Sequence, residues 1–413
     1  MKKLIALILA FATLLSLTAC TSSQDLMKDV PARAVDVLPD MDAGAAAAVD
    51  FGVRLFQTTM EDGKNTLISP LSVLYALAMT ANGADGETLA QMEQVLGMDA
   101  ENLNSFMLAY MDLFPNDKAH KMSLANSIWF KDDPRFEVEE SFLQTNADYY
   151  GASIYKAAFD QGTLTDINAW VRKHTDGVIP EILDRIPEDA IMYLVNTLAF
   201  EAEWDEIYEK NQVWGGEFTN EDGTWQDVEM MHSEERTYIE DEMATGFIKY
   251  YKGQKYAFAA LLPNEGVTVS EYVDSLTGEH LLEMLSDPEH VTTVVTMPKF
   301  EMEYDVEMRE HLEAMGMPDA FDDTVADFSR LGTYTGDGQN ICISRVLHKT
   351  FISVAEKGTK AGAATVVEMV DESAMFVEDY REVVLDRPFV YMLIDCETNL
   401  PFFIGTMMNM EGG

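Results

Sequence analysis

The chain has 413 residues, of which 47% are hydrophobic, and its formal net charge is −44 at pH 7. That hydrophobic content suffices for a large core, and no Pro/Gly/Ser-rich linker or repeat divides the sequence, so we expect one large domain over residues 43–413. The charge argues against nucleic acid and anionic membrane surfaces as partners, and it favours a soluble, self-repelling surface; we expect a monomer.

The N-terminus has the pattern of a processing signal. Two lysines precede an apolar run over residues 4–15, which has the length of a signal-peptide core and is too short to span a bilayer comfortably. The sequence Leu-Thr-Ala-Cys that follows resembles the motif in which a cysteine is lipidated after cleavage. We therefore expect a signal peptide over residues 1–20, a membrane anchor through lipid on Cys20, and an extracellular location on the bacterial cell envelope. An ordinary secretory signal, with Cys20 incidental, is the alternative.

The next segments predict a linker and then helices. Residues 21–42 are polar, acidic or small and have no sustained period, so they predict a flexible tether. Ser69 and Pro70 have the pattern of a helix N-cap followed by a first-turn proline, and they predict a helix that ends at residues 82–86. Further helices are expected from Phe51, from Thr88 and from Ile167 to about Gly177.

Strand-like apolar runs alternate with these helices through the middle and end of the chain. Residues 193–200 are nearly all apolar, which is typical of a strand buried on both faces. The other predicted strands lie within residues 124–129, 228–231, 257–263 and 294–300.

Two cysteines remain after the N-terminal signal. Cys342 and Cys396 lie on apolar runs, without a CxxC motif or the histidine spacing of a metal site. We expect no metal and no cofactor. Buried free thiols are the favoured interpretation, and a bridge between the two cysteines stays open.

A segment near the C-terminus alternates with the period of a strand. Small or apolar side chains share one face, while both charges fall on the other face, so the first face could be buried in a sheet. The residues of the first face are Thr359, Ala361, Ala363, Thr365, Val367 and Met369, and those of the second are Lys360, Gly362, Ala364, Val366, Glu368 and Val370.

The sizes of the free-energy terms favour insertion of this segment into a sheet. Ordering a residue costs roughly 1–2 kcal/mol of backbone entropy, and each new hydrogen bond returns roughly 0.5–1.5 kcal/mol, so the backbone is near balance. Burial of side chains such as Val367 and Met369, at about 1.5–3 kcal/mol each, favours insertion. Asp371 is the first acid on the inward face, so insertion should stop near Met369.

This segment and the residues before it resemble the reactive-loop hinge of the serpins. Other motifs of the family follow in the expected order, so the resemblance covers roughly residues 43–413. The hinge positions are matched by Glu356, Lys357, Gly358, Thr359, Lys360, Ala361, Ala363 and Thr365.

The resemblance implies both a fold and a function. The fold is α+β, with one large mixed sheet, smaller sheets, about eight or nine helices and an exposed reactive loop over about residues 358–382. The implied function is suicide inhibition of serine proteases: the cleaved loop inserts into the main sheet and traps the acyl-enzyme as a covalent complex. The protein would be an inhibitor and not an enzyme, with a serine protease as its partner.

The resemblance also assigns residues beneath and above the site of insertion. Ser69, Ser72, Asn196 and His348 match the polar cluster under the centre of the main sheet, called the shutter. Trp204, Lys299 and Glu356 match the top of the opening, called the breach. His348 has no GxSxG, HExxH or phosphate-loop motif beside it, so we interpret it as structural and not as catalytic.

The scissile bond is assigned by counting from the hinge. Seventeen positions from Glu356, the family's usual spacing, place it between Glu372 and Ser373. The loop after Ser373 is longer than is usual in the family, so elastase-like or chymotrypsin-like cleavage elsewhere is also open. The alternative residues are Met369, Val370, Ala374, Met375 and Phe376.

Some positions depart from the family pattern. Ser353 and Ala355 replace polar and acidic residues, Lys360 replaces an acid, and residues 200–204 lack the usual lysine and glycine. None of these changes puts a bulky or charged group on the inward face, so we expect insertion to survive. The rival functions are a non-inhibitory binding or storage protein, and a lipid-anchored solute-binding protein or enzyme.

Overall fold

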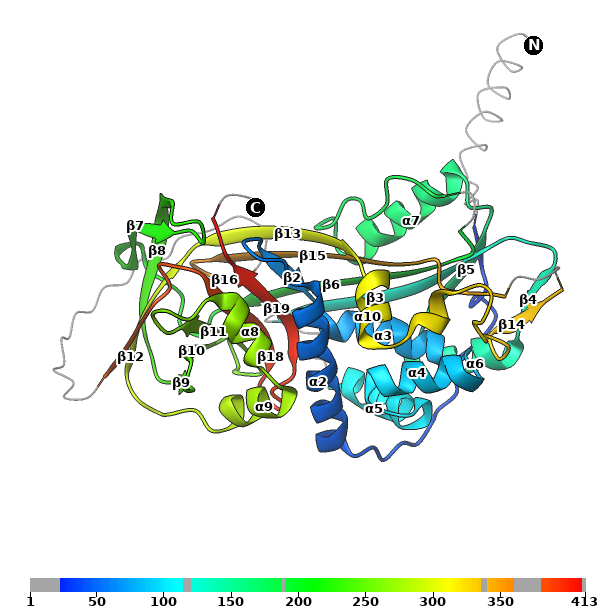
Figure 1. Cartoon of the computed structure of the whole chain (residues 1–413), viewed down its shortest axis with the longest axis horizontal. Coiled ribbons are helices and arrows are strands. Elements are labelled where there is room, and N and C mark those ends of the chain that lie inside the picture. Colours follow the sequence, from blue (N-terminus) through cyan, green and yellow to red (C-terminus); the bar gives the residue numbers. More distant parts are fainter. Residues whose placement is uncertain (1–22, 114–119, 188–189, 336–339, 360–379, 411–413) are drawn as a thin grey trace, which may run out of the picture.

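A computed structural model describes residues 23–113, 120–187, 190–335, 340–359 and 380–410. Within these residues a seven-stranded mixed sheet runs the length of the molecule, with α7 on one face and most other helices on the opposite side (Figure 1). In spatial order its strands are β1 (Gln24–Asp25), β5 (Ser153–Ala157), β3 (His120–Lys131), β6 (Met192–Glu203), β16 (Gly358–Thr359), β15 (Arg345–Ala355) and β13 (Phe300–Glu307).

Three smaller sheets accompany the large one. The six-stranded sheet is antiparallel, with the order β2 (Thr66–Ile68), β19 (Pro401–Met407), β18 (Phe389–Asp395), β11 (Tyr256–Pro263), β10 (Ala244–Tyr250) and β9 (Tyr238–Glu240). The four-stranded sheet has the order β17 (Arg381–Val384), β12 (Thr293–Pro298), β8 (Trp225–Glu235) and β7 (Val213–Thr219). β14 (Gly332–Tyr334) and β4 (Phe136–Val138) form a two-stranded ribbon.

The described residues contain nine α-helices and two short 3-10 helices. They are α2 (Met41–Thr59), α3 (Pro70–Ala81), α4 (Gly86–Leu96), α5 (Ala100–Asp112), α6 (Glu140–Tyr150), α7 (Gln161–His174), α8 (Val269–Ser275), α9 (Gly278–Ser286), α10 (Arg309–Met315), η1 (Lys210–Gln212) and η2 (Pro318–Phe321). The predicted α+β class, with a large mixed sheet and eight or nine helices, is confirmed. Most of the predicted reactive loop, residues 360–379, lies outside the described residues.

Strand β6 is buried on both faces, which accounts for its nearly continuous apolar sequence. Tyr193 and Val195 pack under α7 in a small core, whereas Leu194 and Leu198 face the main core on the other side of the sheet. Because successive residues of a strand point to opposite faces, a strand covered on both sides favours apolar residues at most positions.

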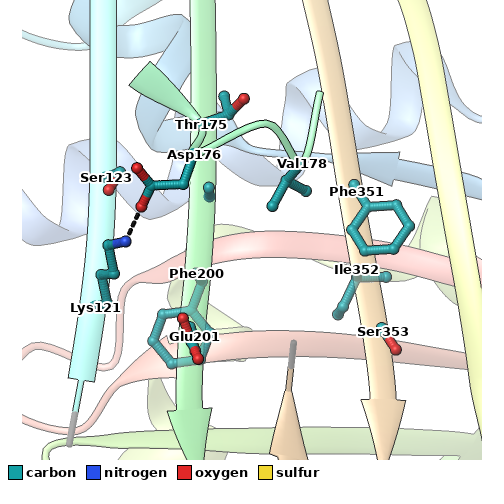
Figure 2. Close-up of a pocket in the computed structure, with 11 residues that line it drawn as sticks. Lys121, Ser123, Thr175, Asp176, Val178, Phe200, Glu201, Phe351, Ile352 and Ser353 are labelled. Atoms are coloured by element: carbon teal, nitrogen blue, oxygen red, sulfur yellow. Dashed lines mark ion pairs between the residues drawn. The ribbon is translucent and has the colours of Figure 1, made fainter. Parts of the chain in front are cut away.

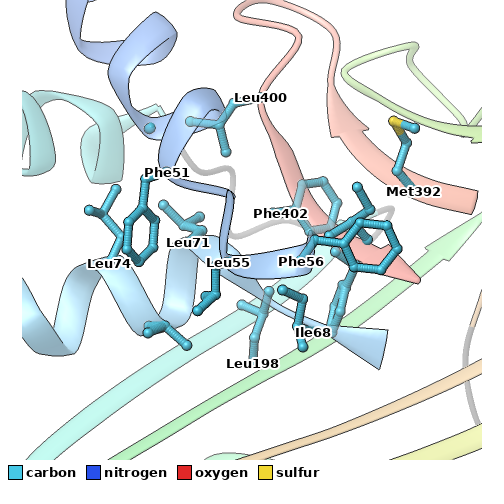
Figure 3. Packing of buried hydrophobic residues seen from close by; sticks show 14 of the residues in the cluster. Phe51, Leu55, Phe56, Ile68, Leu71, Leu74, Leu198, Met392, Leu400 and Phe402 are labelled. Atoms are coloured by element: carbon cyan, nitrogen blue, oxygen red, sulfur yellow. The ribbon is translucent and has the colours of Figure 1, made fainter. Parts of the chain in front are cut away.

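The main core lies where α2 and α3 meet the large and six-stranded sheets. Figure 3 shows Phe51 and Phe56 of α2, Leu71 of α3, Leu198 of β6 and Phe402 of β19 in this packing, and all five are buried. The core thus ties the centre of the large sheet to the helices beneath it.

Local sequence signals place the helix termini. Ser69 is the N-cap of α3, as predicted, and its side chain accepts the Ser72 backbone N–H, while Pro70 occupies the first turn. The predicted start of α7 at Ile167 is wrong, because Asp160 forms a capping box with Thr163 and the helix begins earlier, at Gln161.

The first described residues of the predicted tether are docked on the large sheet. Gln24 and Asp25 pair with β5 at the edge of the large sheet, and the Ser23 hydroxyl donates to an Asp166 carboxylate oxygen on α7 at 2.7 Å. Edge pairing uses main-chain groups, so it leaves no hydrophobic period for sequence reading to detect. The first long helix, α2, begins at Met41, two residues before the predicted domain boundary. The predicted signal peptide, with Cys20, lies outside the described residues.

Candidate functional site

The large sheet is open between its two central strands. β6 and β15 pair in parallel from Tyr193–Thr197 to Arg345–Lys349, and beyond these residues they separate. At the far end the two-residue strand β16 lies between them, antiparallel to both. Residues 198–201 and 350–353 therefore have no strand partner across this gap within the described residues. Two strands that expose unused main-chain donors and acceptors to each other form a place where another strand can pair.

A small cavity of about 30 Å³ lies at this gap. Figure 2 shows its walls: β6 and β15 lie on either side of the gap, and the chain after α7, with Thr175, Asp176 and Val178, passes over it. Asp176 of this crossing segment forms an ion pair with Lys121 of β3. The lining residues are Lys121, Ser123, Thr175, Asp176, Val178, Ala199, Phe200, Glu201, Phe351, Ile352 and Ser353.

The hinge enters the gap at Gly358 and Thr359. Gly358 has a φ of +154°, and a Cβ at this position would collide with the carbonyl oxygen of Ala202, so only glycine fits. Thr359 is 2% exposed, and its hydroxyl shares a hydrogen bond with the Tyr251 hydroxyl. Thr359 is thus buried in the gap, on the face that its period-two pattern assigns to the inside. The other predicted inward residues of the hinge, Ala361, Ala363 and Thr365, lie outside the described residues.

Trp204 holds the turn at the start of the hinge, immediately before Gly358. Its indole N–H donates to the carbonyl of Ala355 at 2.8 Å, and its backbone N–H donates to the carbonyl of Lys357 at 2.8 Å. The indole is fully buried and stacks on Tyr251, with 4.4 Å between ring centroids and 9° between planes. The aromatic predicted for the breach therefore contacts the hinge directly.

Lys299 and Glu356 form the predicted ion pair at the breach. Their Nζ and Oε1 atoms are 2.8 Å apart, and Lys299 also reaches Glu229 of β8 at 2.8 Å. Partial burial opposes the charged forms, but the hydrogen bond from Lys299 still leaves the pKa of Glu356 below its ordinary value. Burial likewise opposes the charge on Lys299, whose pKa is nevertheless raised by Glu229 and Glu356.

We expect replacement of Lys299 by methionine to remove an acid-sensitive contribution to stability. The lowered pKa of Glu356 makes the pair stabilising above the ordinary glutamate value of 4.5, and this contribution is lost as the pH falls through the lower, folded-state pKa. Melting curves of the two proteins should differ at pH 7 and converge in acid. Glu229→Gln keeps the bond to Glu356 and serves as the control. A constant difference at all pH values would contradict this assignment.

The four predicted shutter residues meet beneath the centre of the sheet. The Ser69 backbone N–H donates to His348 Nε2 at 3.0 Å, so His348 carries its proton on Nδ1 and donates it to Asn196 Oδ1. Ser72 Oγ donates to the same amide oxygen at 3.3 Å. Burial lowers the pKa of His348 to about 3, so the imidazole is neutral and serves as a hydrogen-bond bridge.

Sequence reading missed a fifth polar residue in this row. Asn126 of β3 lies directly opposite Asn196, which lies opposite His348 of β15. Both amide atoms of Asn126 and the Asn196 amide nitrogen are buried without a hydrogen-bond partner among the described residues. An asparagine inside an apolar strand was the available signal, because such a group is costly to bury unpaired.

Both cysteines that follow the signal are free thiols, which resolves the open pairing. Burial raises the pKa of Cys342 to about 11 and that of Cys396 to about 12, so neither is an activated nucleophile.

Within the described residues, no group of three or more His, Cys, Asp or Glu side chains could hold a metal ion. No helix there is both long enough and apolar enough to cross a bilayer. Every residue proposed for the scissile bond lies outside the described ranges.

Comparisons with known proteins agree with this architecture. A family model described as Serpin (serine protease inhibitor) matches residues 46–410. The native-state structure of a thermophilic serpin, tengpin, is 46% identical, with a TM-score of 0.90 over 94% of this chain and 100% of its own. The latent-state tengpin structure is 45% identical, with a TM-score of 0.79 over 92% and 100% of the two chains. An uncharacterised serpin-like protein of Thermococcus kodakarensis is 28% identical over 400 residues, which are 94% of this chain and 91% of the relative. The chain therefore belongs to the serpin family of serine protease inhibitors.

Proposed function

We propose that this protein is a suicide-substrate inhibitor of serine proteases that acts by inserting its cleaved loop between β6 and β15. The observation that carries the proposal is the gap between these strands, which Gly358 and Thr359 already enter. The greater similarity to the native than to the latent form of tengpin supports a resting state in which most of the loop has not yet been inserted.

The register of β16 supports one particular path for the proposed insertion. Thr359 lies opposite Ala202 of β6 and Val354 of β15. Continued in this register, residue 365 would lie opposite Asn196 and His348, which are six positions along each strand. The hydroxyl of Thr365 would then reach the shutter row, where buried amide groups lack partners.

In the proposed mechanism, loop insertion competes with hydrolysis of the ester that joins the inhibitor to the protease. The protease serine attacks the scissile carbonyl carbon, the amine of the next residue leaves with a proton, and the inhibitor remains esterified to the enzyme. Water would complete hydrolysis, but insertion of the freed loop moves the attached protease and distorts its active site first. The proposal therefore requires insertion to be faster than deacylation.

The proposed scissile bond is Glu372–Ser373, which fits a protease with a basic specificity pocket. Cleavage beside Met369, Val370, Ala374, Met375 or Phe376 would instead indicate an elastase-like or chymotrypsin-like target. The mass and N-terminal sequence of the fragment released by a reacting protease distinguish these assignments.

A panel of serine proteases tests the function. We expect a complex that survives detergent and boiling, and a large rise in melting temperature when the loop is cleaved by a protease that is not trapped. Cleavage without either result would indicate a non-inhibitory family member. If no protease forms a complex or cleaves the loop, and the protein binds a small ligand instead, the third candidate, a solute-binding protein or enzyme, would be indicated.

We further propose that the protein is lipid-anchored at Cys20 on the outside of a bacterial cell. The lipoprotein-like signal supports this location, where an inhibitor could protect surface proteins from external proteases. Labelling with a fatty-acid analogue in a bacterial host should mark the wild-type protein and leave Cys20→Ala unlabelled. Equal labelling of both proteins would refute the anchor.

A further inference from the structure

A buried lysine lies beneath the breach. Lys249 of β10 is 2% exposed, and its ammonium lies 2.7 Å from a carboxylate oxygen of Glu235 at the end of β8. The same ammonium lies 5.5 Å from the ring centroid of Trp204 and 4.5 Å from that of Tyr208. Burial of a lysine is costly unless its charge is compensated, and here one carboxylate and two aromatic rings provide compensation.

Both of these rings belong to residues that hold the turn over residues 355–357, at the start of the hinge. Trp204 bonds to the carbonyls of residues 355 and 357, and the backbone N–H of Tyr208 donates to the carbonyl of Glu356 at 2.9 Å. Three consecutive carbonyls, immediately before β16, are thus held by two residues that flank Lys249. We call Lys249, Glu235, Trp204 and Tyr208 the hinge clamp.

Further bonds connect the clamp to the inserted residues. The Tyr208 hydroxyl lies 3.2 Å from Ser233 Oγ, which donates to Glu235 at 2.6 Å, so Tyr208 is fixed to the same carboxylate as Lys249. The Tyr251 ring stacks on Trp204 and its hydroxyl bonds to Thr359. The contacts run without interruption from the buried charge to the first residue inside the gap.

We propose that Lys249 is a positioning residue for loop insertion: through Trp204 and Tyr208 it fixes the turn over residues 355–357 so that Gly358 and Thr359 start the new strand. The functional part of this inference rests on the proposed inhibitory mechanism. Without the clamp the hinge would sample other arrangements, insertion would begin more slowly, and more of the acyl-enzyme would be hydrolysed.

The energetics of buried ion pairs distinguish a positioning role of Lys249 from a contribution to stability alone. Replacing both members of a buried ion pair with uncharged groups of similar size is often neutral for stability, whereas removing only one member is strongly destabilising. The attraction of the ammonium for the two rings, in contrast, is lost in both cases. Stability and hinge order should therefore respond differently to the single and the double variant.

The experiment compares Lys249→Met, the double variant Lys249→Met/Glu235→Gln, and Lys249→Arg. The backbone amides of Trp204 and Tyr208 donate to the turn, so their hydrogen-exchange rates measure how firmly the clamp holds it. We expect exchange to be about tenfold faster in both methionine variants, whereas the melting temperature falls in the single variant and recovers in the double variant. Arginine keeps the cation and should restore protection. Lys156→Met on β5 removes a half-buried lysine far from the hinge and is the matched control.

With a reactive protease, the double variant should need at least about twofold more inhibitor per enzyme trapped, because its slower insertion favours hydrolysis. A double variant with wild-type exchange and stoichiometry would refute the positioning role even if the single variant fails to fold. A wild-type protein that traps no protease would refute the inhibitory mechanism, and the exchange measurement would still decide whether Lys249 orders the hinge.

Discussion

Replacement of Thr359 by arginine is expected to turn the inhibitor into a substrate. Thr359 is almost fully buried between β6 and β15, and its hydroxyl meets the Tyr251 hydroxyl beneath the sheet. An arginine there would have to bury an unpaired charge, at a cost of about 3–5 kcal/mol, or withdraw from the gap. Either result slows insertion, so hydrolysis of the acyl-enzyme should predominate. Gel assays with a reactive protease should then show cleaved protein in place of the covalent complex.

The control for this prediction is Thr359→Val, which keeps the shape of the side chain and adds no charge. It loses the hydrogen bond to Tyr251, a net effect of about 1 kcal/mol, and should still form the complex. If the arginine variant traps protease with the stoichiometry of the valine variant, then entry of Thr359 into the sheet is not required for inhibition.

Replacement of His348 by alanine is expected to affect both stability and insertion. The imidazole is fully buried and joins the Ser69 backbone to the Asn196 side chain. Its removal leaves a cavity and unpaired polar groups, which together should cost about 2–5 kcal/mol. Because this bridge connects β15 to β6 and α3, the strands should also separate more readily. Thermal melting and the rate of spontaneous inactivation at a fixed temperature measure the two effects.

Asn146→Ala separates these effects. Asn146 is also fully buried, and its side chain bonds to backbone carbonyls of α3 and α6, away from the gap. We expect it to lower the melting temperature without a matching change in inhibition. A His348 variant that is unchanged in both melting and inhibition would exclude the shutter role.

Much of the fold follows from local signals in the sequence. The Ser69–Pro70 cap and the apolar run of β6 were readable because capping and double-sided burial each require particular residue types at particular positions. The early start of α7 was missed because its capping box is formed by Asp160 and Thr163, which precede the apolar residues. The pairing of β1 was missed because main-chain bonding at a sheet edge is nearly independent of side chains.

The sequence predicts some residues of the candidate site and not others. The shutter and breach residues could be predicted because the family's motifs recur at matching positions. The hinge clamp could not, since Lys249 and Glu235 lie on different strands and an isolated lysine in a sequence has the appearance of a surface residue. Only the folded arrangement reveals that their charges are buried together.

The boundary between β6 and β15 is unpaired over four residues and paired beyond them, and this division predicts a pause in the proposed loop insertion. In the register of β16, residues 360–363 would enter the unpaired stretch and displace no existing bond. From residue 364 onward, each step must separate part of the parallel ladder that joins Tyr193–Thr197 to Arg345–Lys349. A kinetic barrier should therefore arise after four residues, and an intact loop that drifts inward should stall there as a reversible intermediate.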